Sequence, residues 1–143
     1  MLRQFLLGGA ISLVNIAIHA LVTTLVVRVA QRVGAREQPH PSLHLMAVMI
    51  PTVSVLMAIH AIEVVVWAAA YSAADAAPAE AHLIYFAFVN YTTLGYGDVI
   101  PVERWQLLGP ITAMNGVLLF GWSTALIFEV LRRSWSYPVG SAR

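Results

Sequence analysis

Three long apolar stretches decide what this chain can fold into. They run from about Phe5 to Val27, from Leu43 to Ala74 and from Trp105 to Leu131. Each exceeds the roughly 20 helical residues that cross the hydrocarbon core of a bilayer. Only 10% of the 143 residues are charged, whereas a soluble domain carries about 25%. The sequence therefore predicts an all-α integral membrane protein with three transmembrane helices.

A fourth apolar segment, His82 to Thr92, is too short to cross a bilayer, because it has only roughly ten residues. It runs directly into the sequence TTLGYGD, residues 92–98. Non-helical backbone at membrane depth is tolerated only where it is buried in protein or lines a water-filled path. We therefore expect a re-entrant half-helix that returns the chain to the surface from which it came.

The arginines predict how the chain is oriented. Most fall in two groups that an odd number of crossings places on one side of the membrane: Arg28, Arg32, Arg36, Arg132, Arg133 and Arg143. The positive-inside rule makes that side cytoplasmic, so the N-terminus and the half-helix are expected outside and the C-terminus in the cytoplasm. A retained first helix is favoured over a cleaved signal peptide, because the apolar run is long and its arginines mainly follow it. The expected location is the plasma (inner) membrane.

The segment TTLGYGD has the chemistry of an ion path. Backbone carbonyl groups that point toward a central axis can replace the hydration shell of K⁺. Such a path needs backbone conformations of alternating handedness, which Gly95 and Gly97 adopt without steric cost. The Thr93 hydroxyl can add a ligand, and the C-terminal end of the half-helix carries a partial negative charge that favours a cation.

This segment resembles the selectivity filter of tetrameric potassium channels, whose pattern is Thr-x-x-Thr-x-Gly-Tyr-Gly-Asp. The resemblance covers roughly residues 43–133, as an outer helix, a pore helix, a filter and an inner helix, and residues 1–30 would form an additional N-terminal transmembrane helix. It implies a homotetramer in lipid that conducts K⁺ passively, with no covalent chemistry and no cofactor besides the permeant ion. A net charge of +1 gives no case for nucleic-acid binding.

The resemblance also assigns roles to residues around the filter. Carbonyl groups of Thr93, Leu94, Gly95 and Tyr96 would coordinate K⁺, with Gly97 completing the filter. Asn90, Thr92 and Asp98 would support it, Asp98 as a partner of the pore helix behind the filter. Asn90 stands where the family has its first threonine, and Leu94 replaces the commoner valine or isoleucine. Gly116 lies where a hinge of the inner helix is expected.

Several polar residues fall within the first two predicted spans, where ionisable groups are rare and unfavourable, among them Asn15, His19, His60 and Glu63. Counted from the outer helix ends, Asn15 and His60 come at about the same depth, with Glu63 near Ser12. We expect a buried hydrogen-bonded cluster that clamps the first helix to the second. A pH sensor remains open, because histidine titrates near neutrality. A metal or haem site built from His19, His60 and Glu63 also remains open.

Other residues carry smaller expectations. Pro51 and Pro110 could kink the second and third helices, because each removes a backbone hydrogen bond. Asn115 either faces a central cavity or bonds a neighbouring helix, and the second is favoured. Glu129 is expected to pair with Arg132 and Arg133, with a role in an inner gate as the alternative.

Two rival functions stay open beside a potassium channel. A cation channel of relaxed selectivity would keep the architecture, and the intact Thr-Leu-Gly-Tyr-Gly run argues against it. A membrane metal- or haem-binding protein would use the histidines and leave TTLGYGD unexplained.

Overall fold

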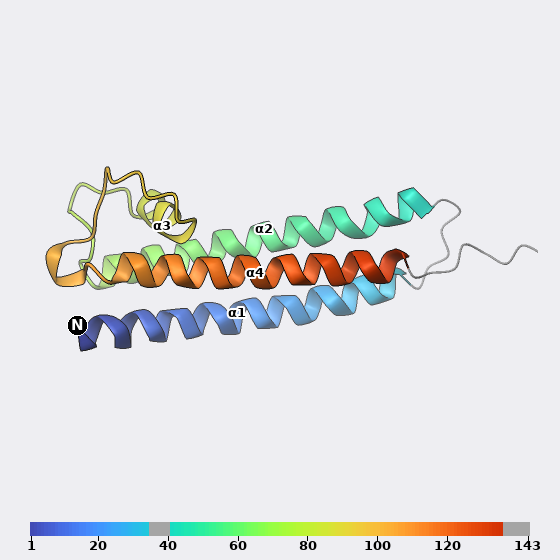
Figure 1. Cartoon of the computed structure of the whole chain (residues 1–143), viewed down its shortest axis with the longest axis horizontal. Coiled ribbons are helices and arrows are strands. Elements are labelled where there is room, and N and C mark those ends of the chain that lie inside the picture. The colour runs from blue at the N-terminus through green and yellow to red at the C-terminus, as the bar shows by residue number, and fades with distance from the viewer. Residues whose placement is uncertain (35–40, 136–143) are drawn as a thin grey trace, which may run out of the picture.

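A computed structural model describes residues 1–34 and 41–135 of the chain. Three long helices lie side by side, and a short helix packs beside them near one end (Figure 1). The elements in order are α1 (Leu2–Gly34), α2 (Pro41–Ala73), α3 (Leu83–Tyr91), the 3₁₀ turn η1 (Glu103–Trp105) and α4 (Leu108–Trp135). No strand occurs in these two ranges, so the prediction of an all-α fold is confirmed.

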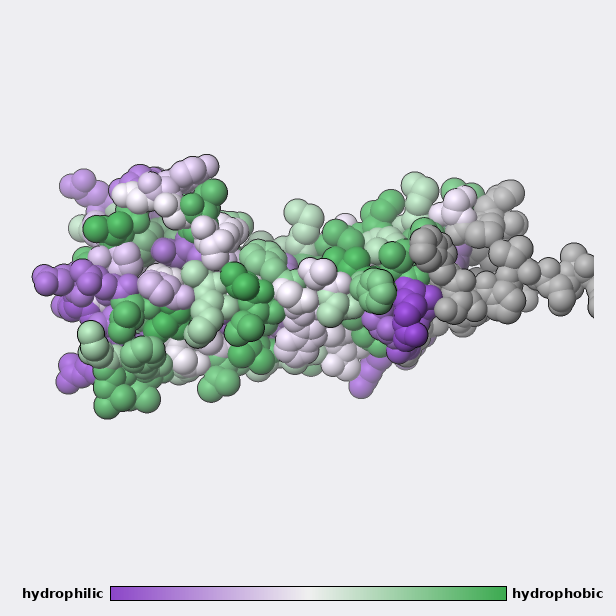
Figure 2. Space-filling model, viewed as in Figure 1, coloured by the Kyte–Doolittle hydropathy of each residue, from purple (hydrophilic) through white to green (hydrophobic). Residues whose placement is uncertain are grey.

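The three long helices contain segments long and apolar enough to cross a membrane. The candidate spans are Leu2–Val29, Ser42–Ala73 and Glu103–Ser134, of which the last also includes η1. Large apolar side chains such as Leu21, Met57 and Phe128 lie exposed on the outside of the single chain. Figure 2 shows green, hydrophobic atoms along the middle of the molecule and purple, hydrophilic atoms toward its two ends. This distribution suits a protein whose middle is surrounded by lipid or by other apolar helices.

The packing places α3 and α1 against the same pair of helices. Both α1 and α3 contact α2 and α4, and Figure 1 shows α1 and α3 on opposite sides of α4. The N-terminus lies at the same end of the bundle as α3 (Figure 1). Arg28, Arg32, Arg132 and Arg133 lie toward the other end, in the last parts of α1 and α4; Arg36 and Arg143 lie outside the described residues.

The prediction that Pro110 kinks its helix by removing a backbone hydrogen bond is wrong. Pro110 is the third residue of α4, which begins at Leu108 and not at Trp105. A proline in the first turn of a helix removes no intrahelical hydrogen bond, because the first N–H groups have no partner there. Pro51 lies inside α2, which continues through it as a single helix to Ala73.

Candidate functional site

The end of α3 leads directly into the TTLGYGD segment. Thr92 caps the helix, and its backbone N–H donates to the Phe88 carbonyl at 2.9 Å. Thr93 then turns the chain, with a positive φ of 61° that ends the helical path. The Leu94 N–H still reaches back to the Val89 carbonyl at 3.0 Å. The first residues of the segment are therefore fixed on the C-terminal end of α3.

Every second residue of the segment adopts the left-handed backbone conformation. Thr93, Gly95 and Gly97 have φ values of 61°, 55° and 79°. The residues between them lie outside this region, so the handedness alternates along 93–97. Glycine adopts a positive φ at no steric cost, whereas a residue with a side chain is strained there. The backbone thus has the alternation expected of a carbonyl-lined ion path.

One chain alone leaves this segment open. Leu94 is 53% exposed and Tyr96 is 68% exposed. A Cβ atom built on Gly97 would meet no other atom within 4 Å. Large apolar side chains in such exposed positions are typical of a surface that another molecule covers.

Side chains behind the segment hold it to α3. Asp98 accepts a hydrogen bond from the Tyr85 hydroxyl at 2.7 Å, a contact with α3 of the kind that the resemblance implies. This hydrogen bond to the carboxylate raises the pKa of Tyr85 above its usual value, because it stabilises the protonated phenol. Asn90 donates to the Phe86 carbonyl at 2.9 Å, and the Thr92 hydroxyl donates to the Phe88 carbonyl at 2.7 Å. Both of these side chains satisfy the backbone of α3 itself.

Gly116 allows α4 to pack tightly against the end of α3. A Cβ atom at this position would overlap the backbone carbonyl oxygen of Tyr91. Backbone cannot move aside as a flexible side chain can, so only glycine fits this contact. Helix α4 continues through Gly116 without a break, and a role for Gly116 as a hinge stays a prediction.

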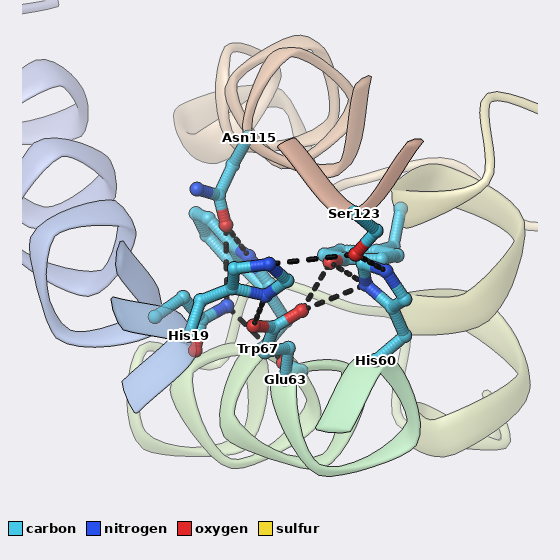
Figure 3. A network of polar contacts seen from close by, with 8 residues as sticks. His19, His60, Glu63, Trp67, Asn115 and Ser123 are labelled. Atoms are coloured by element: carbon cyan, nitrogen blue, oxygen red, sulfur yellow. Dashed lines mark hydrogen bonds and ion pairs between the residues drawn. The ribbon is translucent and has the colours of Figure 1, made fainter. Parts of the chain in front are cut away.

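A buried polar cluster around Glu63 lies next to the C-terminal end of α3 (Figure 3). The Glu63 carboxylate of α2 is fully buried and lies 2.8 Å from His19 Nδ1 of α1. Its second oxygen lies 2.9 Å from His60 Nδ1, one turn away on the same helix. The clamp between α1 and α2 that the sequence predicts is therefore present in the structure.

The cluster extends to α3 and α4 through two hydroxyl groups. The Tyr91 hydroxyl donates to Glu63 Oε2 at 2.5 Å and lies 2.9 Å from His60 Nδ1. Ser123 Oγ lies 2.9 Å from His60 Nε2 and 3.4 Å from His19 Nε2. All four helices thus contribute to a cluster of one carboxylate and two imidazoles. Tyr91, which belongs to this cluster, directly precedes Thr92.

A second group of polar residues continues the cluster from the other side of Glu63. Asn15 Nδ2 donates to the Glu63 backbone carbonyl at 3.3 Å and to Asn115 Oδ1 at 3.2 Å. The indole N–H of Trp67 donates to the same Asn115 oxygen at 3.0 Å. Asn115 is 2% exposed in the single chain, so its predicted bond to a neighbouring helix is confirmed.

The predicted register of α1 against α2 is wrong by about one helical turn. Asn15 and His19, not Ser12, lie beside Glu63, and Asn15 makes no hydrogen bond to His60. The Ser12 hydroxyl is buried without a partner among the described residues. Buried polar groups need partners, so side-chain hydrogen bonding sets this register more strongly than distance from the helix ends.

Two members of the cluster were missed by sequence reasoning. Tyr91 stands in an apolar, aromatic stretch, where its ring predicts packing and its hydroxyl draws no attention. Ser123 is a small residue in the middle of α4 without a distinctive spacing. A signal existed for Tyr91, because a tyrosine at membrane depth usually finds a partner for its hydroxyl.

At the far end of α4, Glu129 pairs with Arg132 at 2.9 Å and with Arg133 at 2.5 Å, as predicted.

Comparison with known proteins identifies the class of the molecule. The sequence model of the family described as "Ion channel" matches residues 59–133, which is more than half of the chain. The match starts inside α2 and includes α3, the TTLGYGD segment and nearly all of α4. No curated protein and no solved structure matches the chain. The chain belongs to the ion channel family.

Proposed function

We propose that this ion channel is selective for K⁺ and works as a homotetramer. Four TLGYG segments would surround a common axis, and carbonyl groups of Thr93, Leu94, Gly95 and Tyr96 would coordinate the ions. Conduction is passive, with K⁺ moving down its electrochemical gradient and no cofactor or covalent step. Assembly is required because one segment cannot surround an ion.

The observation that carries the proposal is the alternating backbone of TTLGYGD at the end of a half-helix. Left-handed conformations at Thr93, Gly95 and Gly97 alternate with residues outside that region, and such alternation lets successive carbonyl groups point to the same side of the segment, as an ion path requires. The exposed faces of Leu94 and Tyr96 support assembly, since further subunits would cover them. Helix α1 would lie at the periphery, because it packs on α2 and α4 and leaves the open side of α3 free.

The proposed setting is the plasma (inner) membrane, with the filter outside. Arginines toward the end opposite α3 support this orientation through the positive-inside rule. The N-terminus, which lies at the α3 end, would then be outside and the C-terminus in the cytoplasm.

Potassium flux into liposomes that contain the purified protein tests the proposal. Wild-type protein should carry K⁺, and Gly95→Ala should abolish the flux, because φ is 55° at this position. Gly121→Ala is the matched control, since a Cβ there meets no atom within 4 Å and the residue is helical. Flux that survives Gly95→Ala would remove the filter from the mechanism.

A cation channel without K⁺ preference is the rival within the same architecture. It would also lose flux in Gly95→Ala, so the flux assay alone does not separate the two. Reversal potentials in mixed K⁺ and Na⁺ do separate them, because a non-selective pore would give equal permeabilities.

A further inference from the structure

We propose that His19, His60 and Glu63 form a buried binding site for one divalent transition-metal ion of the Zn²⁺ class. The inference goes beyond ion conduction and does not rest on K⁺ selectivity. Ligand atoms of the three residues all lie within 4.8 Å of one another. They come from α1 and α2, and Figure 3 shows the Glu63 carboxylate between the two imidazoles.

The chemistry of the donor set fits such an ion. Two imidazole nitrogens and one carboxylate oxygen are a common ligand set for Zn²⁺ in proteins. Bonds of about 2.0–2.2 Å in a tetrahedral site hold the ligand atoms roughly 3.3–3.6 Å apart. Small rotations of the three side chains therefore bring them to bonding distance.

The hydrogen bonds of the cluster do not balance when both histidines are neutral and donate to Glu63 from Nδ1. The Tyr91 hydroxyl donates to Glu63, and Nδ1 of His19 and of His60 lies 2.8 and 2.9 Å from the same carboxylate, where a neutral imidazole bonds the carboxylate only with its proton on Nδ1. With the protons on Nδ1, both Nε2 atoms are acceptors. Both Nε2 atoms face Ser123 Oγ, at 2.9 and 3.4 Å. One hydroxyl proton satisfies only one of them, so an acceptor is left facing an acceptor.

A bound metal ion removes this conflict. The ion takes the two Nδ1 lone pairs and the carboxylate, so the imidazole protons move to the Nε2 atoms. Both N–H groups then donate to the two lone pairs of Ser123 Oγ. Metal-bound histidines generally use their second ring nitrogen in this way, and such partners orient the ligands.

The charge of the cluster gives an independent reason for a cation. The Glu63 side chain is 0% exposed. Its side-chain hydrogen-bond partners within the described chain are His19, His60 and Tyr91, and none of them is an arginine. A buried carboxylate without a positive partner is strongly disfavoured in an apolar layer. Protonation of a single imidazole could also supply the positive charge, but it would involve only one of the two histidines. A metal ion would bind both.

Tyr91 and Ser123 are positioning residues in this site. The Tyr91 hydroxyl holds Glu63 Oε2 at 2.5 Å, and Ser123 holds the outer nitrogens of both imidazoles. Because the Tyr91 backbone continues into Thr92 and Thr93, the site is linked through a single residue to the filter segment.

Metal binding by the full chain tests the proposal. The protein is purified in detergent without a polyhistidine tag, stripped with a chelator and titrated with Zn²⁺ and with Co²⁺. Zn²⁺ content is measured by mass spectrometry, and Co²⁺ is followed by its visible absorption. We expect one Zn²⁺ per chain and a Co²⁺ spectrum of low coordination number. His19→Gln and His60→Gln should weaken binding by about 100-fold or more, and Tyr91→Phe and Ser123→Ala by about 10-fold to 100-fold.

His82→Gln is the matched control, because this histidine precedes α3 and lies outside the cluster. Tyr91→Phe and Ser123→Ala keep all three ligands, so they remain informative where a ligand variant does not fold. Wild-type protein with no stoichiometric Zn²⁺ would overturn the proposal and leave a protonated imidazole as the buried cation. Equal loss of binding in His82→Gln would overturn it as well. Neither result bears on the proposed K⁺ selectivity, because K⁺ flux is measured in a separate assay.

Discussion

The TTLGYGD segment and the polar cluster meet at Tyr91, yet they differ in how far one chain buries them. The backbone of Tyr91 leads into Thr92 and this segment, while its hydroxyl belongs to the cluster around Glu63. In the TTLGYGD segment, Tyr96 is 68% exposed. In the cluster, His19 and Glu63 are completely buried within one chain.

This difference separates a cluster that one chain completes from a segment that one chain leaves exposed. The cluster joins four helices of a single chain, so its residues should determine whether that chain folds. The TTLGYGD segment has its backbone conformation without being enclosed, so in the proposed tetramer its residues should determine transport. Changes in the two regions are therefore expected to affect different measurements.

The largest effect is expected on transport from Gly97→Ala. Gly97 has a φ of 79°, and a side chain in this region costs roughly 1–2 kcal/mol. A tetramer would count this strain four times. We expect K⁺ flux to fall by at least about a hundredfold, since 1.4 kcal/mol is a factor of ten, while helix content by circular dichroism stays the same. A loss of helix content would show that Gly97 affects folding as well as transport, against the expected division between the two regions.

The next largest effect is expected on folding from Glu63→Gln. Gln replaces one carboxylate oxygen with an NH₂ group, so buried donors around Glu63 lose an acceptor, at about 1–3 kcal/mol for each donor left unsatisfied. Unfolding of the purified protein in detergent should show this loss of stability. Glu129→Gln is the matched control, because Glu129 pairs with two arginines near the exposed end of α4. Similar losses in the two variants would mean that the buried cluster has no special role in the fold.

A smaller loss of stability is expected from Gly116→Ala. A methyl group there overlaps the Tyr91 carbonyl oxygen, and overpacking of this kind typically costs about 1–3 kcal/mol. The same unfolding assay measures it, with Gly121→Ala as a control in open space on the same helix. Full stability in Gly116→Ala would show that α3 and α4 do not pack as closely as the structure describes.

The smallest effect is expected from Tyr85→Phe, and it depends on pH. The hydrogen bond to Asp98 raises the pKa of Tyr85. The folded state therefore favours the protonated phenol, and this stabilisation is complete below the unfolded pKa of about 10. It is lost as the pH rises through the higher pKa of the folded state. Wild-type flux should decline in alkaline buffer, whereas flux through Tyr85→Phe should lack this decline; equal declines would contradict the role of the pair.

Much of the fold was predictable because it depends on local properties of the sequence. Apolar length predicts the three long helices, and the short apolar run ending at Thr92 predicts that α3 is too short to cross a membrane. The ion pairs of Glu129 follow from spacing along one helix. The glycines of TTLGYGD predicted the backbone handedness, because few other residues adopt it.

The site was less predictable where it depends on how separate helices meet. Neither apolar length nor spacing fixes how far α1 slides along α2, so the sequence predicts Ser12 beside Glu63, where the structure has Asn15 and His19. Tyr91 and Ser123 contribute through a single hydroxyl each, and nothing in the spacing of α3 or α4 shows that these hydroxyls face the same carboxylate. The sequence predicts a hinge at Gly116 from its position in α4, but its close contact with the Tyr91 carbonyl depends on how α3 and α4 pack.

We propose that four TLGYG segments make a potassium-selective pore. The reversal potential of reconstituted wild-type protein, in a bilayer with K⁺ on one side and Na⁺ on the other, tests this proposal. A reversal potential close to that of a K⁺ electrode is the predicted result. A reversal potential near zero, showing equal permeability to the two ions, would contradict the claim.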